Sequence, residues 1–304
     1  MGKAPRRLEG SRDRVKVLLD TDIGSSIDDA ICLSYLLAQP RCELLGITTV
    51  TGEARKRAMI ASALCKVAGR DVPILPGCEK PMLVQQQQLH APQAAALPRW
   101  QHETHFPQGE AVQFLRQTIR NNPGEVVLLT IGPLTNIGLL FTLDPKISSL
   151  LKGLVMMCGV FTNRLGGVGP VEWNIEIDPH AAAIVYQATP PIHRSIGLDV
   201  TSQVTMTRKE LCKRFHASLL KPVVDFAGTR FQHQDQIIFH DPLAATTLFD
   251  DTICRFTKGN VEIELQNDRL SGLTYWKPGS RAHHEIALEV NSARFFDHFT
   301  AILH

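Results

Sequence analysis

Four aspartates lie close together near the N-terminus, directly after an apolar run. Asp20, Asp22, Asp28 and Asp29 all fall within the stretch VKVLLDTDIGSSIDDA. Carboxylates this close repel one another in water by roughly 1 kcal/mol per adjacent pair, and a hard divalent cation turns that repulsion into attraction. Ligands that are all oxygen favour Ca²⁺ or Mg²⁺ over Zn²⁺. The alternative is that acids favour the first turn of any helix, with Asp28 as an ordinary cap.

Three further groups of polar residues have types and spacings that suit chemistry. The segment TIGPLTN (130–136) forms a tight turn that can direct a backbone carbonyl into a cleft, and IIFHDPLAA places His240 and Asp241 at a helix start. In VEWNIEIDP, Glu172 and Asn174 are two residues apart, which puts them on the same side of an extended segment. Taken singly, each group also fits a turn, a solvated edge or a structural His–Asp pair.

The elements that must position these residues alternate along the chain between strand-like and helix-like segments. We expect strands at 15–19, 42–50, 71–75, 125–131, 154–157 and 193–198, and helices at about 28–39, 53–69, 111–121, 178–188 and after the 130–136 turn. The last third is less regular, with helices expected over about 208–231 and 241–249, strands at 261–265 and 285–290, and a terminal helix. The pattern predicts an α/β fold, a single-domain, open, mostly parallel sheet flanked by helices.

In open α/β sheets, ligands bind beyond the carboxyl ends of the strands. The polar clusters at 20–29, 131–136 and 158–174 each follow an expected strand, so we expect one site built from several loops. The glutamine run 85–88 and the Pro/Ala stretch after it, to about residue 105, are expected to form a long surface loop.

The composition is that of an ordinary soluble globular protein. The chain has 304 residues, of which 44% are hydrophobic and 20% charged, and we expect residues 1–14 to form a tail and residues 15–304 one domain. A net charge of +2 gives no reason to expect nucleic acid or an anionic membrane as a partner, and no apolar run reaches the length of a membrane span. Seven scattered cysteines without a C-x-x-C pair predict a reducing, cytoplasmic setting.

In combination, the ordered motifs are specific. DTDIG-SSIDD, GPLTN, EWNIEIDP and HDP together resemble the inosine–uridine-preferring nucleoside hydrolase family, over about residues 15–303. The resemblance implies an N-ribohydrolase that binds Ca²⁺, takes a small nucleoside substrate and forms a homodimer or homotetramer. The residue types suit that reaction, because breaking the N-glycosidic bond develops positive charge on the ribose and a carboxylate-rich pocket stabilises it.

Carried over by motif, the resemblance implies a set of calcium ligands. These are Asp22, Asp29, Asp241 and the backbone carbonyl of Ile131, which needs no particular side chain. Asp22 would also act as the base that takes a proton from the attacking water.

The same resemblance implies the substrate contacts. Asp28, Glu172 and Asn174 would hold the ribose hydroxyls, Met157 would lie under the sugar, and His240 would lie near the leaving base.

The sequence also departs from the family pattern. Ile23 replaces a proline, and two extra residues precede the acid pair. Glu53, at the end of TVTGE, replaces an asparagine, and it is one of the residues that we expect to contact the substrate. An ionised carboxylate cannot donate a hydrogen bond to a leaving base. Cys158 stands where a glycine is usual. These differences put substrate choice, and activity itself, in question more than the fold.

Two other functions fit parts of the pattern. In a phosphohydrolase of the haloacid dehalogenase type, Asp20 would be the nucleophile and Asp22 the acid/base, with Mg²⁺, but the later Lys and acid pair that this class needs are not evident. A non-catalytic protein that binds nucleoside or ribose on the same fold is suggested by Glu53 and Cys158.

Overall fold

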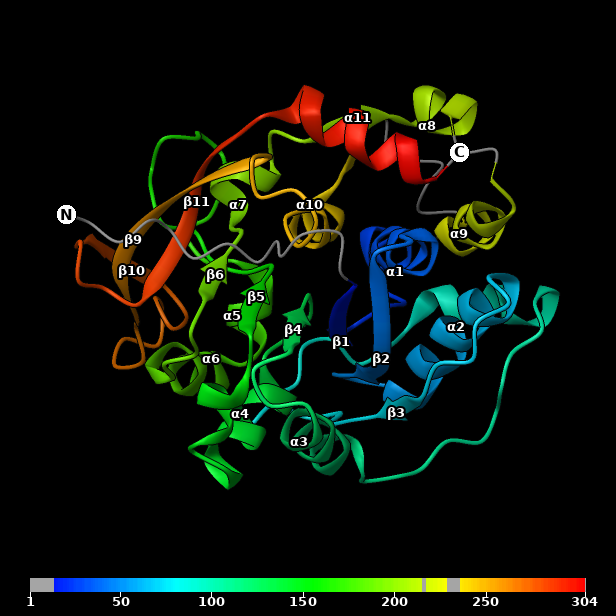
Figure 1. The fold of residues 1–304 in the computed structure, drawn as a ribbon. Coiled ribbons are helices and arrows are strands. Elements are labelled where there is room, and N and C mark those ends of the chain that lie inside the picture. The colour runs from blue at the N-terminus through cyan, green and yellow to red at the C-terminus, as the bar shows by residue number, and fades with distance from the viewer. Residues whose placement is uncertain (1–13, 215–216, 229–235, 304) are drawn as a thin grey trace.

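The computed structural model describes residues 14–214, 217–228 and 236–303, and the expected tail at 1–14 lies almost wholly outside them. Its core is a nine-stranded sheet with the order β10-β9-β11-β6-β5-β4-β1-β2-β3 (Figure 1). Seven strands run parallel, namely β1 (Val15–Thr21), β2 (Cys42–Thr49), β3 (Ile74–Pro76), β4 (Val126–Thr130), β5 (Gly153–Met156), β6 (His193–Ser195) and β11 (His284–Val290). The strands β9 (Cys254–Ile263) and β10 (Thr274–Pro278) extend one edge in antiparallel order. The expected α/β fold with an open, mostly parallel sheet is confirmed.

Helices cover both faces of the sheet, and the side chains of β1 show why. Val15, Val17 and Leu19 point into one apolar core and Leu18 into the other, because alternate residues of a strand face opposite sides. The first core is closed by α1 (Asp28–Ala38), α2 (Ala54–Val67), α10 (His240–Thr246) and α11 (Ser292–Ile302). The second is closed by α3 (Ala111–Asn121), α4 (Thr135–Leu143) and α6 (Pro179–Gln187).

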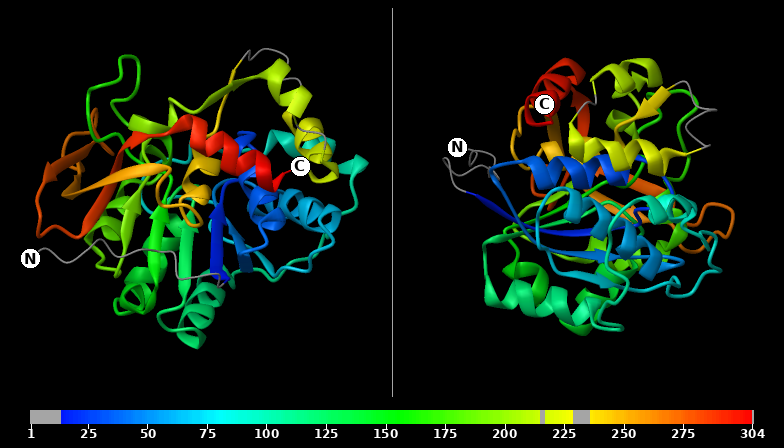
Figure 2. Two further views of the ribbon diagram at one scale, coloured as in Figure 1. Left: turned by 45° about the horizontal axis from the view of Figure 1, so that its top comes forward. Right: turned by 90° about the vertical axis from the view of Figure 1, so that its right-hand side faces the viewer.

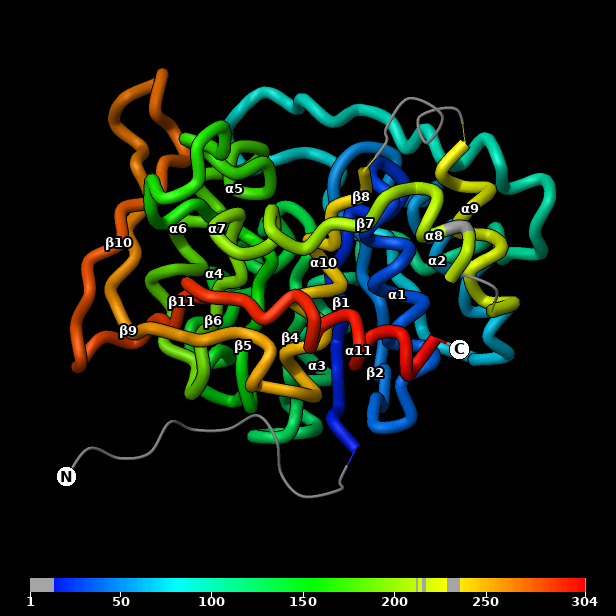
Figure 3. The backbone as a smooth tube through the Cα atoms, turned by 90° about the horizontal axis from the view of Figure 1, so that it is seen from above, coloured from blue at the N-terminus to red at the C-terminus, as the bar shows by residue number. Residues whose placement is uncertain are grey.

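The C-terminal helix α11 lies against α1 and α10, as the views in Figure 2 and Figure 3 show. The register aligns the carboxyl ends of the central strands. Asp20 of β1 pairs with Thr48 of β2 and Thr130 of β4, and Thr130 pairs with Met156 of β5. The loops that leave β1, β4 and β5 therefore emerge side by side.

The last third of the chain differs from expectation. The helix expected over 208–231 is wrong, because the chain instead forms α8 (Arg208–Arg214), the 3-10 turn η3 (Ser218–Leu220) and α9 (Lys221–Ala227). Pro222 lies in the first turn of α9, where a proline can begin a helix but cannot continue one from the preceding residues. Residues 229–231 of that expectation lie outside the described part.

Several short elements were not expected from the sequence. They are the 3-10 turns η1 (Pro92–Arg99) and η2 (Ile147–Leu150), the helices α5 (Trp173–Ile177) and α7 (Leu198–Thr201), the antiparallel pair β7 (Thr205–Thr207) and β8 (Gln236–Ile238), and strand β10. The strand expected at 193–198 ends at Ser195, and the one expected at 261–265 begins earlier, at Cys254.

Within the described ranges, no helix is both long enough and apolar enough to cross a bilayer. Six cysteines there are free: Cys32, Cys42, Cys65, Cys78, Cys158 and Cys254.

Candidate active site

One cavity of about 650 Å³ opens where the loops after β1, β4 and β5 meet the start of α10. Every residue predicted for the site lines this cavity except Glu53, so the structure brings the predicted residues of several loops together in one cavity. The lining residues with predicted roles are Asp22, Asp28, Asp29, Ile131, Met157, Glu172, Asn174, His240 and Asp241.

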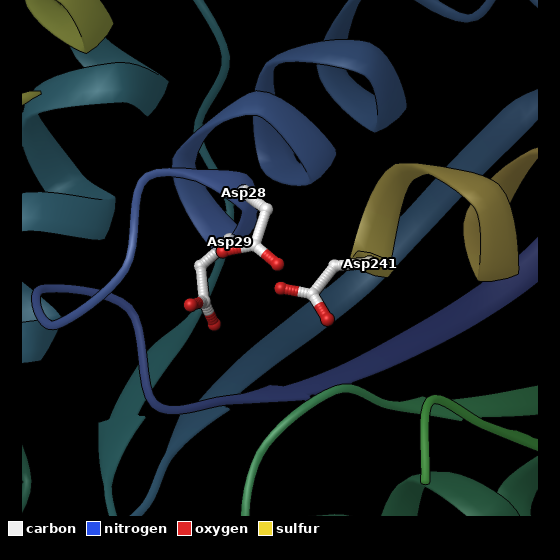
Figure 4. Close-up of side chains that lie close together, drawn as sticks. All are labelled: Asp28, Asp29 and Asp241. Carbon is white, nitrogen blue, oxygen red and sulfur yellow. The ribbon is translucent and has the colours of Figure 1, made fainter. Parts of the chain in front are cut away.

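Three carboxylates converge at the base of α1 and α10. One oxygen from each of Asp28, Asp29 and Asp241 lies within 4.8 Å of the others, and Figure 4 shows the side chains directed toward one another from the first turns of the two helices. All three are almost fully buried, and Asp28 Oδ1 has no hydrogen-bond partner among the described residues. Such a set of buried, unneutralised oxygens is suited to a divalent cation.

The alternative in which Asp28 is an ordinary helix cap does not hold. The residue at the cap of α1 is Ile27, and no side chain caps this helix end. Asp28 and Asp29 instead occupy the first turn, where free backbone N–H groups favour negative charge. The helix N-terminus therefore partly stabilises the two buried carboxylates but does not neutralise their charge.

Asp22 reaches the same cavity from the loop after β1. Its Oδ2 accepts a hydrogen bond of 2.6 Å from Gln88 Nε2, and its backbone carbonyl accepts one from Arg57. Gly132, in the turn after β4, packs so closely that an added Cβ would lie 2.7 Å from Asp22 N and 3.0 Å from Asp22 Oδ1. The glycine in the 130–136 turn is therefore required by close approach to Asp22.

Arg57 of α2 is fully buried beside the acids, but most of its hydrogen bonds are to main-chain carbonyls. Its guanidinium donates to Ser25 Oγ and to the backbone carbonyls of Gly52, Asp22, Ile23 and His90. Sequence reasoning missed Arg57, because an arginine in an amphipathic helix is usually exposed. No ion pair joins Asp22, Asp28, Asp29 or Asp241 to a Lys or Arg in the part of the chain that the structure describes.

Burial dominates the electrostatics of the site. It raises the pKa of Asp22, although the charge of Arg57 and the Gln88 N–H oppose the rise. Burial raises the pKa of Asp29 and Asp241 well above the ordinary value, and the neighbouring carboxylates add to both shifts. Because the charged forms are destabilised in the absence of a cation, a bound cation would have a large favourable effect here.

Glu172 and Asn174 both face the cavity, but the extended segment expected for them is wrong. Asn174 lies in α5 and Glu172 is its N-cap, with a carboxylate that accepts from the backbone N–H groups of Asn174 (2.8 Å) and Gly159 (3.2 Å). Asn174 Nδ2 donates to the carbonyls of Ile131 (3.2 Å) and Met157 (3.0 Å), so it ties together the loops after β4 and β5. Burial raises the pKa of Glu172 to about 7.

His240 lies at the first position of α10 and lines the same cavity as the residues of α5. Its Nδ1 lies 2.8 Å from Thr201 Oγ1, which fixes the plane of the ring. Burial lowers the pKa of His240, while the nearby Asp28 opposes the shift. A neutral imidazole at neutral pH can still present one N–H to a ligand.

Glu53 does not lie in the site. The residue is in the left-handed region (φ 59°), and its carboxylate accepts from Lys56 Nζ (2.6 Å) and the Ala91 N–H (2.8 Å). These bonds, with the Lys56 hydrogen bond the largest contribution, lower the pKa of Glu53 to about 2. The expected substrate contact is replaced by a structural one that fastens the 88–91 segment to α2.

The loop expected at the surface instead contributes directly to the cavity. Gln88 is only 8% exposed and hydrogen-bonds to Asp22, Ser25 and Trp173. The glutamine run gave no signal for this role, because nothing in its composition separates Gln88 from Gln85.

Asp20 and Cys158 lie behind the site. Asp20 is buried and accepts from Thr48 Oγ1 (2.5 Å) and Asn136 Nδ2 (2.7 Å), and it does not line the cavity, as a phosphohydrolase nucleophile would have to. Cys158 Sγ lies 3.2 Å from Tyr186 Oη in the core.

This chain is similar to known proteins in sequence and in fold. The profile of the family described as inosine-uridine preferring nucleoside hydrolase matches residues 17–297. An inosine-uridine preferring nucleoside hydrolase from Leishmania major is 31% identical over 85% of this chain and 86% of its own, and a probable uridine nucleosidase from Oryza sativa is 31% identical over 83% and 79%. Among solved structures, a plant nucleoside hydrolase superimposes with a TM-score of 0.82 at 23% identity, covering 95% of this chain and 98% of its own.

Proposed function

Because this chain belongs to the inosine-uridine preferring nucleoside hydrolase family and is a ribonucleoside N-ribohydrolase, we propose that water activated by Asp22 cleaves the bond between ribose C1′ and the nucleobase. The observation that carries this proposal is the set of buried acids that form no ion pair with a described Lys or Arg and that come to one cavity from early and late parts of the chain. A pocket of this charge favours a sugar that becomes positive in the transition state.

We propose Ca²⁺ as the cation, held by Asp22, Asp29, Asp241 and the Ile131 carbonyl. The donor set fits, because it consists of oxygens alone. Asp28, which lies within 4.8 Å of Asp29 and Asp241, adds a buried Oδ1 that has no hydrogen-bond partner among the described residues. When bound, Ca²⁺ supplies positive charge that holds the carboxylates together, orients sugar hydroxyls and makes water easier to deprotonate.

The remaining steps belong to side chains. Asp22 takes a proton from the attacking water, because a carboxylate within hydrogen-bond reach of a water can act as its general base. Asp28, Glu172 and Asn174 accept from or donate to the ribose hydroxyls, and Met157 packs under the sugar. Binding the diol on this rigid set of loop ends orients C1′ for attack.

His240 is proposed to assist the leaving base. A nucleobase departs as an anion unless it receives a proton or a hydrogen bond. With Nδ1 near Thr201, the Nε2 side of the ring is the one available to the cavity.

The proposal is tested by release of reducing sugar from inosine, uridine, cytidine and adenosine. With Ca²⁺ present we expect turnover of inosine or uridine, the nucleosides in the name of the Leishmania relative, and loss of activity in excess EDTA. Asp22→Asn should lower kcat by about 10²–10⁴, the usual contribution of a general base, while circular dichroism stays unchanged.

Absence of turnover for all four nucleosides, with Ca²⁺ bound in calorimetry, would contradict the proposal. If calorimetry also showed nucleoside bound without turnover, the non-catalytic binding protein would be the better description.

A cytoplasmic, homo-oligomeric state belongs to the same proposal. The free thiols in the described residues suit a reducing compartment, and the family resemblance implies a dimer or tetramer. Light scattering during size-exclusion chromatography measures the mass of the assembly and so checks the oligomeric state.

A further inference from the structure

The carboxamide of Gln88 links three separate segments across the cavity. Its Nε2 donates to Asp22 Oδ2 (2.6 Å) and Ser25 Oγ (2.6 Å), and its Oε1 accepts from Trp173 Nε1 (2.9 Å). The orientation is determined, because an indole N–H can only donate and must therefore face the oxygen. The nitrogen is then left to face the Asp22 carboxylate.

Asp22 needs such a partner. It shares the cavity with Asp28, Asp29 and Asp241, and like charges drive its carboxylate away from them. Arg57 holds the main chain of this loop and does not pair with the carboxylate. A neutral N–H donor can fix the direction of a carboxylate without cancelling the charge that a cation requires.

The backbones that carry Gln88 and Asp22 are fastened to each other. Arg57 donates both to the Asp22 carbonyl and to the carbonyl of His90, two residues after Gln88 (3.1 Å for the latter). At the other carboxylate oxygen, a Cβ added to Gly132 would lie 3.0 Å from Oδ1, so the turn after β4 comes close to Asp22 there. Gln88 therefore holds Oδ2 by a hydrogen bond, while the glycine leaves space for Oδ1 that a larger residue would occupy.

We propose that Gln88 is a positioning residue that aims the Asp22 carboxylate at the cation and the attacking water, with Trp173 as the anchor of its carboxamide. This inference rests on the proposed function of Asp22 and extends it to a loop outside the family motifs of the sequence. Gln88 acts through Asp22, so its removal changes cation binding and the chemical step more than it changes nucleoside binding.

The experiment compares Gln88→Leu with Gln85→Leu, a matched change in an exposed residue of the same glutamine run that does not line the cavity. Cation affinity is measured by calorimetric titration with Ca²⁺ alone, without nucleoside. We expect Gln88→Leu to raise the Kd for Ca²⁺ by about 10- to 100-fold, as loss of a partner behind a ligand usually does, and Gln85→Leu to leave it unchanged.

At saturating Ca²⁺, kcat of Gln88→Leu should fall by about tenfold or more while KM stays within about threefold, because the ribose contacts are intact. Trp173→Phe keeps one aromatic ring but removes the N–H donor together with the second ring of the indole, so it should also raise the Kd, by a smaller factor. This variant also covers the case in which Gln88→Leu fails to fold.

Two results overturn this inference while leaving the proposed function intact, and both require that the wild type binds Ca²⁺ and cleaves nucleoside. In the first, Gln88→Leu and Gln85→Leu have the same Kd for Ca²⁺ and the same kcat. In the second, Gln88→Leu raises KM at unchanged kcat, which would make Gln88 a direct substrate contact. A wild-type protein that neither binds Ca²⁺ nor cleaves nucleoside contradicts the proposed function first, and this inference with it.

Discussion

Neighbouring aspartates of one motif have different hydrogen-bond partners. Asp20 accepts through Oδ1 from Thr48 and Asn136 and helps to join β1, β2 and α4, while its buried Oδ2 has no partner among the described residues. Asp29 accepts from Thr21 Oγ1 at 2.6 Å, while Asp22 accepts from Gln88. Residue type alone would make Asp20 as good a candidate for the site as Asp22, and their partners and their places relative to the cavity separate them.

At this scale the motif residues could be predicted and their supporting residues could not. Asp22, Asp29 and Asp241 follow strands or begin helices, a pattern visible in the sequence. Arg57 and Gln88 owe their place to contacts with residues more than 30 positions away, and no local pattern records such contacts.

The role of His240 is tested by varying the leaving group. His240→Ala should lower kcat/KM for inosine by about 100-fold or more, in the range expected for a general acid. With nitrophenyl riboside the loss should be less than about fivefold, because nitrophenolate leaves without a proton. Steady-state rates on the two substrates provide the comparison, and an equal loss on both would exclude assistance to the leaving group.

Among the elements, the parallel part of the sheet was predictable because its strands are buried on both faces and therefore appear as short apolar runs. The edge strand β10 was not, because its exposed residues, such as Tyr275, and its terminal Pro278 resemble a loop. The short helix α5 escaped detection for a similar reason, since a helix of one turn has no apolar period to recognise.

The turn after β4 packs closely against the loop after β1 at Gly132, so a larger residue there should disturb both loops. Gly132→Ala forces its methyl group against Asp22, and we expect a loss of about 1–3 kcal/mol in the free energy of unfolding, as overpacking usually causes. Weaker Ca²⁺ binding should accompany it, because Asp22 is displaced.

Gly166→Ala is the control for this change, since an added Cβ there meets nothing within 4 Å. Urea denaturation gives the free energies of unfolding and calorimetry the affinities. Equal stability and affinity in the two variants would show that the β4 turn does not constrain Asp22.

Over the whole molecule, the site exists only because folding brings distant acids together. Asp28 and Asp29 begin α1, whereas Asp241 begins α10 more than 200 residues later, and the two helices pack side by side on one face of the sheet. Without a cation, the fold has to hold these carboxylates together against their repulsion, so stability and cation binding are coupled.

Asp241→Asn should therefore change stability in opposite directions with and without Ca²⁺. In EDTA the variant should be more stable than the wild type, by about 1 kcal/mol, because one repelling charge is removed from the buried cluster. With Ca²⁺ at about 100 times its Kd, the wild type should gain about 2.7 kcal/mol and the variant much less, because the variant has lost a ligand. Urea denaturation of both proteins in the two buffers gives the free energies of unfolding, and their difference should change sign between EDTA and Ca²⁺. If both gained the same stability from Ca²⁺, Asp241 would not be a ligand, and the acids of α1 and α10 would not share one ion.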